Sequence, residues 1–202
     1  MPQVIMPSSH QPNDAQPAFA DLAPISGYHV QTKGLTGIER MLLVSDGTFT
    51  PQLEALLGRP LVIKVLRNGE VPVDARIAER FAPTPVTTIW RRQVAQADAL
   101  SGRTYMHADS YVNIDAFGND LRRHLIESAL GIGRIARMLP RPPEREPVGF
   151  YIEQNEAEAL ELGLERTEQF LCKVYRMKVA GAYAAVITER MPRSLLAIRQ
   201  SG

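Results

Sequence analysis

The chain has 202 residues, of which 45% are hydrophobic and 22% are charged. This ordinary globular composition supports one hydrophobic core and argues against a second large domain. Lys and Arg number 23 against 22 Asp and Glu, so the net charge of +1 favours neither a nucleic-acid-binding surface nor an acidic disordered chain.

Hydropathy and cysteine content argue against a membrane protein and against secretion. The longest nearly apolar run, from Val179 to Ile187, is about half of the roughly 20 residues that a membrane-spanning helix needs. The single cysteine, Cys172, cannot form an internal disulfide, and the N-terminus lacks a basic segment followed by an apolar one. We therefore expect a soluble, cytoplasmic protein that binds neither membrane nor nucleic acid.

The sequence divides into a leader and one domain. Five of the 15 prolines fall in the first 34 residues, among Ser, Gln, Asn and Asp, and no helical or strand period is visible there. Apolar content this scattered does not offset the entropy of ordering the chain. The prediction is a flexible leader over residues 1–34 and a folded domain over residues 35–202. The alternative is that the leader packs on the domain as an arm.

The domain is predicted to begin with two short helices. Thr36–Glu39 fits a capping box, and the apolar stripe over Ile38–Val44 predicts a helix that ends at Asp46-Gly47. Thr50 is a good N-cap for a second helix, which Gly58 ends in the left-handed conformation.

The rest of the domain predicts strands joined mainly by hairpins. The β-branched run Leu61–Leu66 indicates a strand that an Asn68-Gly69 turn closes. Further strands are expected over 86–97, 104–114, 148–153, 168–179 and 183–191, and helices over 115–130, 132–139 and 156–162. Because hairpins dominate over crossovers, the predicted class is α+β, with a single antiparallel β-sheet and helices packed on one side.

Three charged residues, Arg92, Arg176 and Glu189, alternate with apolar residues on strand faces that otherwise look buried. Burying a lone charge is costly, so each should face an opposite charge or a ligand. If Gly181 and Ala182 form the turn of the last hairpin, Glu189 is the diagonal neighbour of Arg176, and the two would flank one small pocket. The alternative is a structural ion pair between them.

Several common site chemistries lack their motifs. The four histidines are dispersed and Cys172 has no neighbouring thiol, so no metal site is expected. There is no Gly-x-Ser-x-Gly elbow and no Walker loop. The glycine pattern over 131–136 follows a predicted helix instead of a strand, which argues against a dinucleotide-binding motif.

Five short segments of the domain occur in an order that is typical of one enzyme family. They are Glu39–Thr50, Trp90–Arg92, Ala108–Asp115, Gly131–Arg134 and Val186–Glu189. Together they resemble the chorismate pyruvate-lyases, and most closely the branch found in mycobacterial phenolic glycolipid and cyanobacterial quinone pathways. The resemblance covers about residues 35–196.

The resemblance implies a fold, a substrate and a reaction. The family fold is a small antiparallel sheet with helices that enclose a buried ligand pocket. The family's enzymes eliminate pyruvate from chorismate to give 4-hydroxybenzoate, and they need no metal or redox cofactor. The expected partner is therefore a small-molecule substrate, and a monomer is the default because no heptad or exposed apolar stripe is evident.

The resemblance also assigns roles to residues of this sequence. Arg92 and Glu189 are the expected catalytic residues: Arg92 would bind a substrate carboxylate, and Glu189 would act near C4, either as a base or as a protonated hydrogen-bond donor. The backbone amide that holds the ligand falls on Ile132, beside Gly133. A methionine that lines the pocket falls on Phe49.

Three further positions bear on the resemblance. Arg176 matches a basic position in the penultimate strand and is expected to contribute to substrate binding. Gly131 stands where the ubiquinone-pathway branch tends to have proline, and Asp109 stands where that branch has arginine. Pocket geometry near these two positions is therefore expected to differ from that branch.

A second function of the same fold stays open. The fold resembles the effector-binding domains of bacterial transcription regulators, in which the pocket senses a small ligand and performs no chemistry. Those proteins carry a winged-helix DNA-binding domain ahead of the pocket, and the first 34 residues are too short and too polar to form one. The alternative is therefore a non-catalytic domain that binds a small aromatic acid.

Overall fold

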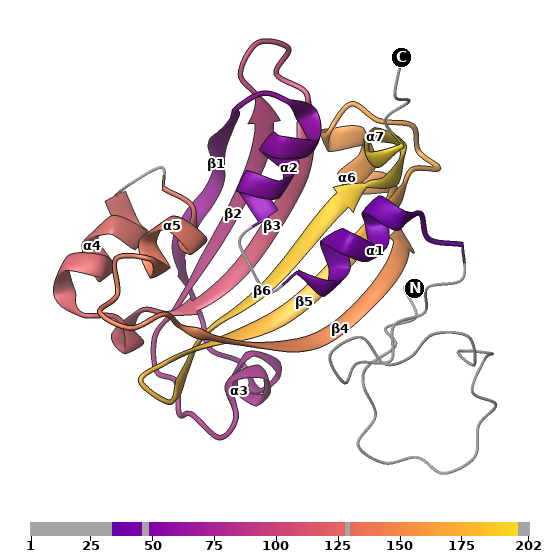
Figure 1. Cartoon of the computed structure of the whole chain (residues 1–202). Helices are drawn as coiled ribbons and strands as arrows, with labels where there is room; N and C mark the ends of the chain where they lie inside the picture. Colours follow the sequence, from indigo (N-terminus) through magenta and orange to yellow (C-terminus); the bar gives the residue numbers. More distant parts are fainter. Residues whose placement is uncertain (1–33, 46–48, 128–129, 198–202) are drawn as a thin grey trace.

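The computed structural model describes residues 34–45, 49–127 and 130–197 (Figure 1). The predicted leader, residues 1–34, lies outside these ranges except for its last residue. The described chain forms one antiparallel sheet with short helices on both faces, which confirms the α+β class.

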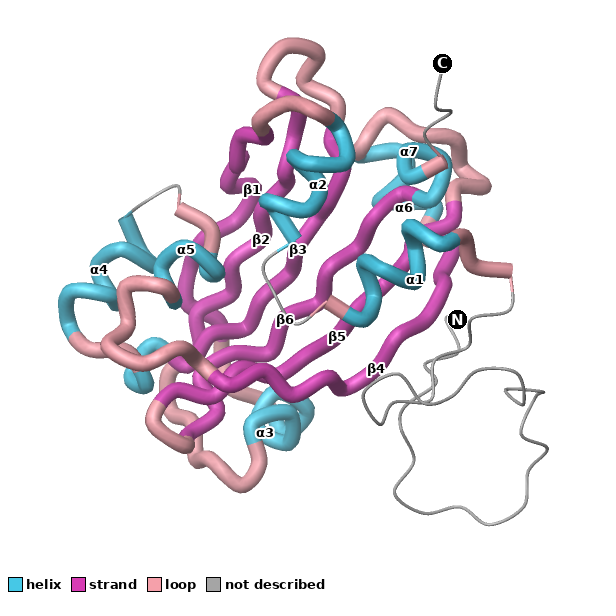
Figure 2. The backbone as a smooth tube through the Cα atoms, viewed as in Figure 1, coloured by secondary structure: helices cyan, strands magenta, loops and turns pink. Residues whose placement is uncertain are grey.

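The sheet has six strands in the order β1-β2-β3-β6-β5-β4 (Figure 2). Their bounds are Leu61–Val71 (β1), Ile89–Asp98 (β2), Thr104–Asn113 (β3), Glu144–Gln154 (β4), Gln169–Val179 (β5) and Ala182–Pro192 (β6). Because β6 pairs with β3, the connection from β3 to β4 must pass across the sheet. That connection contains α4 and α5, and it becomes one wall of the site described below.

The helices cover both faces of the sheet, so the prediction of helices on one side is wrong. On one face lie α1 (Gly37–Val44), α2 (Phe49–Leu57), α5 (Ile132–Ala136) and α7 (Arg193–Leu196), with α4 (Asn119–Glu127) beside α5 (Figure 1). On the other lie α3 (Ala75–Phe81) and α6 (Glu156–Glu161). The second face needs cover because it is apolar too: Phe81 of α3 packs on Ile89 and Val186, and Ala159 of α6 packs on Phe170.

The first helix forms as its capping box predicts. The Thr36 hydroxyl accepts from the Glu39 amide at 3.2 Å, and the Glu39 carboxylate accepts from the Thr36 amide at 2.7 Å. Glu39 is buried, and it also accepts from Arg193 Nε of α7 at 2.5 Å. This ion pair ties the first helix of the domain to the last one.

The predicted turn at Asn68-Gly69 is absent, and β1 continues to Val71. Asn68 stays in the strand because its side chain has partners on neighbouring elements. It accepts from the Trp90 indole N–H at 2.6 Å and donates to the Ile126 carbonyl of α4 at 2.6 Å. A turn signal of local propensity is thus overridden by tertiary hydrogen bonds.

Other predicted boundaries shift for local reasons. The helix expected over 115–130 is divided into the 3₁₀ turn Ile114–Ala116 and α4, and residues 128–129 lie outside the described chain. Strand β4 begins at Glu144 and includes Pro147, which an edge strand tolerates because the missing N–H can face away from the ladder. The helix α3 falls in a segment that was expected to be a connection.

The last hairpin turns at Ala180 and Gly181, both with positive φ (51° and 82°), one residue earlier than predicted. A bulge between Met177 and Lys178 then shifts the register once more. Arg176 therefore lies opposite Val186 instead of Ile187. Because a slip of one residue exchanges the faces of a strand, Arg176 and Glu189 lie on opposite faces of the sheet.

We expect Asn68→Ala to lower the free energy of unfolding by about 2 kcal/mol, because it leaves the Trp90 indole N–H and a carbonyl of α4 without their partner. Arg67→Ala, at an exposed neighbour on the same strand, should change it by less than about 0.5 kcal/mol. Urea unfolding of both variants measures the difference, and equal stability would contradict a tertiary role for Asn68.

Candidate active site

A cavity of about 750 Å³ lies between the sheet and the helices α2 and α5. Its floor is the sheet face formed by β2, β3, β5 and β6, and its walls include the start of α2 and the α4–α5 connection. Of the residues assigned by resemblance, it brings together Phe49, Arg92, Ile132, Gly133 and Glu189.

The cavity floor includes two adjacent rows of cross-strand neighbours. Residues that pair directly across antiparallel strands project to the same face of the sheet. One row is Arg92, Ser110, Ile187 and Tyr175, and the next is Val94, Ala108 and Glu189. The second row continues to Lys173, which does not itself line the cavity. The strand register thus places Arg92 and Glu189 on the same face, two strands apart.

Arg92 is a buried cation on the floor, with 1% of its surface exposed. Its Nη1 donates to the Leu125 carbonyl at 2.7 Å, and its Nη2 donates to the Leu130 carbonyl at 2.8 Å. Burial lowers the pKa of this guanidinium. The two carbonyls lie at the end of α4 and just before α5, so Arg92 holds the α4–α5 connection against β2.

Glu189 is a buried carboxylate on the same floor, with 6% of its surface exposed. The Tyr175 hydroxyl donates to its Oε1 at 3.2 Å. Its Oε2 has no hydrogen-bond partner among the described residues. Burial raises the pKa of Glu189 to about 7, against the opposing effects of Lys173, Tyr175 and Arg145. Near neutral pH this carboxyl group can therefore hold or release a proton.

Lys173 is a third buried charge, and the sequence analysis missed it. It lies directly opposite Glu189 in the β5–β6 pairing. Its ammonium donates to the Ser45 carbonyl at the end of α1 and lies 4.8 Å from the centre of the Phe49 ring. The sequence does contain a signal for this buried charge, because Lys173 shares its strand face with apolar residues, on the side of β5 opposite to Arg176.

The two helical walls contribute the remaining assigned residues. Phe49 begins α2 and is 1% exposed. Ile132 and Gly133 open α5, where backbone amides of the first turn have no carbonyl partner within the helix. Gly131 precedes them at a close approach, because a Cβ there would lie 2.8 Å from Ile63 Cδ1. A proline at this position would require Ile63 to move, which gives a physical basis for this departure from the ubiquinone-pathway branch.

The prediction that Arg176 shares a pocket with Glu189 is wrong. Arg176 lies on the opposite face of the sheet, where its Nε donates to Glu146 at 3.1 Å and its guanidinium lies 4.0 Å from the centre of the Tyr183 ring. The earlier turn and the bulge at Ala184 of β6 cause this difference. The ion pair does exist, but with Glu146 as the partner.

Asp109, the other departure from the ubiquinone-pathway branch, is also on the opposite face. It accepts two hydrogen bonds from Arg91, at 3.0 and 2.7 Å, and one from Gln93 at 3.2 Å. It therefore does not change the cavity directly.

The structure was also searched for metal-binding groups and membrane helices. Within residues 34–45, 49–127 and 130–197, no three or more His, Cys, Asp or Glu side chains group so as to hold a metal ion. No helix in the same ranges has the length and apolarity required to cross a membrane.

We expect the buried Glu189 carboxylate to make stability depend on pH. Because burial raises its pKa from 4.5 to about 7 on folding, the folded state holds this proton more tightly than the unfolded state. The resulting stabilisation is complete below the unfolded pKa and is lost as pH rises through about 7. Relative to Glu189→Gln, the wild type should lose about 2 kcal/mol between roughly pH 5 and pH 8.5.

Denaturant unfolding across this pH range measures the effect, with Glu165→Gln, an exposed glutamate, as the control. The control should follow the wild type. Identical pH slopes for the wild type and Glu189→Gln would contradict the raised pKa.

Several solved structures share the fold. The effector domain of PhnF from Mycobacterium smegmatis aligns with a TM-score of 0.58 and 9% identity, over 73% of this chain and 90% of that one. The gene product SA0254 from Staphylococcus aureus aligns with a TM-score of 0.56 and 12% sequence identity, over 75% of this chain and 91% of that one. The C-terminal domain of the histidine utilization repressor from Pseudomonas syringae aligns with a TM-score of 0.54 and 16% sequence identity, over 70% of this chain and 96% of that one. At these identities the likeness establishes the fold alone.

Sequence comparison is more specific. No functionally curated protein matches the chain significantly. A family model described as "Chorismate pyruvate-lyase Rv2949c-like" matches residues 43–199, a span that contains every residue lining the cavity. The chain therefore belongs to the Rv2949c-like chorismate pyruvate-lyase family.

Proposed function

We propose that this protein is a chorismate pyruvate-lyase, which converts chorismate to 4-hydroxybenzoate and pyruvate. The observation that carries the proposal is that one cavity is lined by Arg92, Glu189, Ile132 and Phe49, positions to which the resemblance assigns substrate binding or catalysis. Family membership supports the reaction. The cavity volume of about 750 Å³ is in the range that small-molecule sites occupy.

The reaction requires the protein to bind anions and to accept a proton. The ether bond from C3 to the enolpyruvyl group breaks, and the hydrogen at C4 leaves as a proton, so that the ring becomes aromatic. The released enolpyruvate takes up one proton on carbon and becomes pyruvate. The conversion involves no external oxidant or reductant. Aromatisation supplies the driving force, and the site must orient the substrate and exclude water.

Arg92 suits the ring carboxylate. A guanidinium carries five N–H donors, so one side chain can serve both the carbonyls of the α4–α5 connection and a planar carboxylate. The fixed carbonyl bonds also hold the guanidinium in one orientation before the substrate arrives. The Ile132 amide, at the first turn of α5, would add a neutral donor from the same wall.

Glu189 suits the proton acceptor at C4. Its Oε1 accepts from Tyr175, while Oε2, which lacks a hydrogen-bond partner among the described residues, is available to accept a proton. A base is most effective when its pKa lies near the working pH, and the pKa of Glu189 is about 7. We therefore propose that the ionised carboxylate of Glu189 removes the C4 proton.

The deciding experiment incubates purified protein with chorismate and follows both products by chromatography. Equal amounts of pyruvate and 4-hydroxybenzoate support the lyase. Saturable binding of 4-hydroxybenzoate without any turnover would instead support a non-catalytic domain that binds an aromatic acid; the effector domain of PhnF shares the fold.

We expect Arg92→Lys to reduce kcat/KM for chorismate about 100-fold, because a lysine cannot donate to two carbonyls and hold a carboxylate in a planar fork. Arg91→Lys is the matched control: Arg91 is the next residue of the same strand, and its side chain pairs with Asp109 on the opposite face. The control should retain kcat/KM within about threefold. Equal losses of kcat/KM in the two variants would show that Arg92 has no specific role in the site.

We also expect kcat/KM to rise with pH through about 7 and then level off, because the proposed base must be ionised in the free enzyme. Glu189→Gln should lose about 100-fold or more in kcat and show no inflection in this range. Steady-state kinetics across the range measures both. A kcat/KM that falls through the same pH would assign Glu189 the role of protonated donor.

A further inference from the structure

Gln96 is a buried polar residue that lines the cavity. It lies on β2, and 6% of its surface is exposed. Its side-chain Oε1 is buried and has no hydrogen-bond partner among the described residues. A buried acceptor without a partner is destabilising, so an amide at this position needs a physical reason.

The strand register explains why the protein does not pair this amide. The direct neighbours of Gln96 across the sheet are Ile63 on β1 and Met106 on β3, and both are apolar. Asp98, two residues further along β2, is already held in an ion pair with Arg59 at 3.0 Å. Ile63, Gln96 and Met106 all line the cavity, so they form a third row of its floor. A ligand in the cavity can therefore reach the amide that the sheet leaves unpaired.

The same register places Gln96 relative to the two proposed catalytic residues. Arg92 and Gln96 project from the same face of β2, and four residues along a strand span about 13 Å. Glu189 lies two strands away, in the row between them. A ring that lies over Val94 and Ala108 therefore has Arg92 at one end and Gln96 at the other. Glu189 is at its side.

The unpaired atom determines which substrate group fits. An amide oxygen accepts hydrogen bonds, so its partner must be a donor. The chorismate dianion has two carboxylates, an ether and one hydroxyl, so the hydroxyl at C4 is its only donor. C4 is para to the carbon that bears the ring carboxylate. A para-substituted ring with one hydrogen bond at each end spans about 12 Å, which is close to the separation of Arg92 and Gln96.

A substrate carboxylate fits this end of the cavity poorly. Glu54 of α2 also lines the cavity, and its Oε1 accepts from the Leu61 amide at 2.9 Å. Leu61 lies on β1, two residues before Ile63, the cross-strand neighbour of Gln96. A carboxylate next to Gln96 would therefore be close to a second negative charge, whereas a hydroxyl would not.

We propose that Gln96 accepts a hydrogen bond from the C4 hydroxyl and so makes the site specific for a ring that is hydroxylated at C4. This inference rests on the proposed function and adds a specificity-determining residue to it. Glu189 removes the hydrogen of C4 while Gln96 holds the hydroxyl of the same carbon. As the ring becomes aromatic, the alcohol becomes a phenol, which is a stronger donor. The bond to Gln96 therefore strengthens as the reaction proceeds.

Benzoate and 4-hydroxybenzoate test this assignment, because they differ only in the hydroxyl. The wild type should bind 4-hydroxybenzoate about tenfold more tightly. In Gln96→Met, which keeps the side-chain length without the amide, the preference should fall below about twofold, and the affinity for benzoate should stay within about twofold of the wild type. 3-Hydroxybenzoate, with its hydroxyl at the neighbouring ring position, should bind the wild type no better than benzoate. Calorimetry measures these dissociation constants without any need for turnover.

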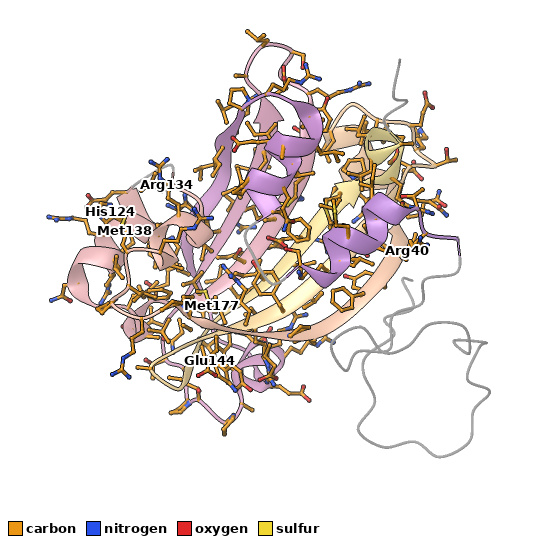
Figure 3. The ribbon with its side chains drawn as sticks, viewed as in Figure 1. Arg40, His124, Arg134, Met138, Glu144 and Met177 are labelled. Carbon is orange, nitrogen blue, oxygen red and sulfur yellow. The ribbon has the colours of Figure 1, made fainter. Side chains whose placement is uncertain are left out.

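Two further variants serve as controls. Gln154→Met removes an exposed amide that does not line the cavity, and it should bind both probes as the wild type does. Arg134 extends from α5 and lines the cavity (Figure 3). Arg134→Gln should change the affinity for both probes by the same factor, since both carry the ring carboxylate.

Urea unfolding separates a ligand-binding role of Gln96 from a structural one. Gln96→Met should unfold at the same or a higher urea concentration than the wild type, because it removes an unpaired buried amide. A lower urea midpoint together with an equal loss of affinity for both probes would show a structural role and overturn the proposal.

Two other results would also overturn it. One is a wild type that binds benzoate as tightly as 4-hydroxybenzoate. The other is a preference for 4-hydroxybenzoate that persists in Gln96→Met or is lost in Arg134→Gln, because another group would then bind the hydroxyl. Failure of the proposed function is a separate result, because it is the absence of pyruvate and 4-hydroxybenzoate from wild-type protein given chorismate.

Discussion

The site depends on a buried cation that backbone carbonyls hold in place. Arg92 lies on the floor of the cavity, and its guanidinium donates to the carbonyls of Leu125 and Leu130. This arrangement ties the position of α5 to β2, because the two carbonyls belong to the connection that leads into α5. The positions of the cavity wall and of the first-turn amides of α5 follow from where that connection is held. A neutral residue at this position would leave two buried carbonyls without their donor.

The opposite charge, Glu189, has its properties set by the same sheet face. The strand register separates it from Arg92 by two strands, so the two charges do not neutralise each other. Tyr175 and Lys173 moderate the cost of burial without removing it, and the pKa of Glu189 stays near 7. A substrate that brings carboxylates and a removable proton would find complementary groups at both ends of the floor.

Much of this arrangement could be predicted where the signal was local. The Thr36 capping box and the alternation that buries Arg92 and Glu189 depend on neighbouring residues, and the structure bears them out. The errors came from interactions across the fold. Asn68 resembles a turn residue until its partners on β2 and α4 are known, and Arg176 changes face because of a bulge that no sequence period indicates. The α4–α5 wall depends on how distant elements pack, and the hydrophobic period of the sequence contains no such information.

The ion pair between Glu39 and Arg193 has a consequence for how the domain opens. These residues belong to the first and last helices, and the apolar side chains of both helices share one cluster with β5 and β6. If α7 detaches, the buried Glu39 carboxylate loses its partner. A buried charge without a partner is destabilising, so α1, which carries Glu39, loses stability as well. The two helices should therefore unfold as one cooperative unit, so amide hydrogen exchange would report a single protection value for both ends of the domain.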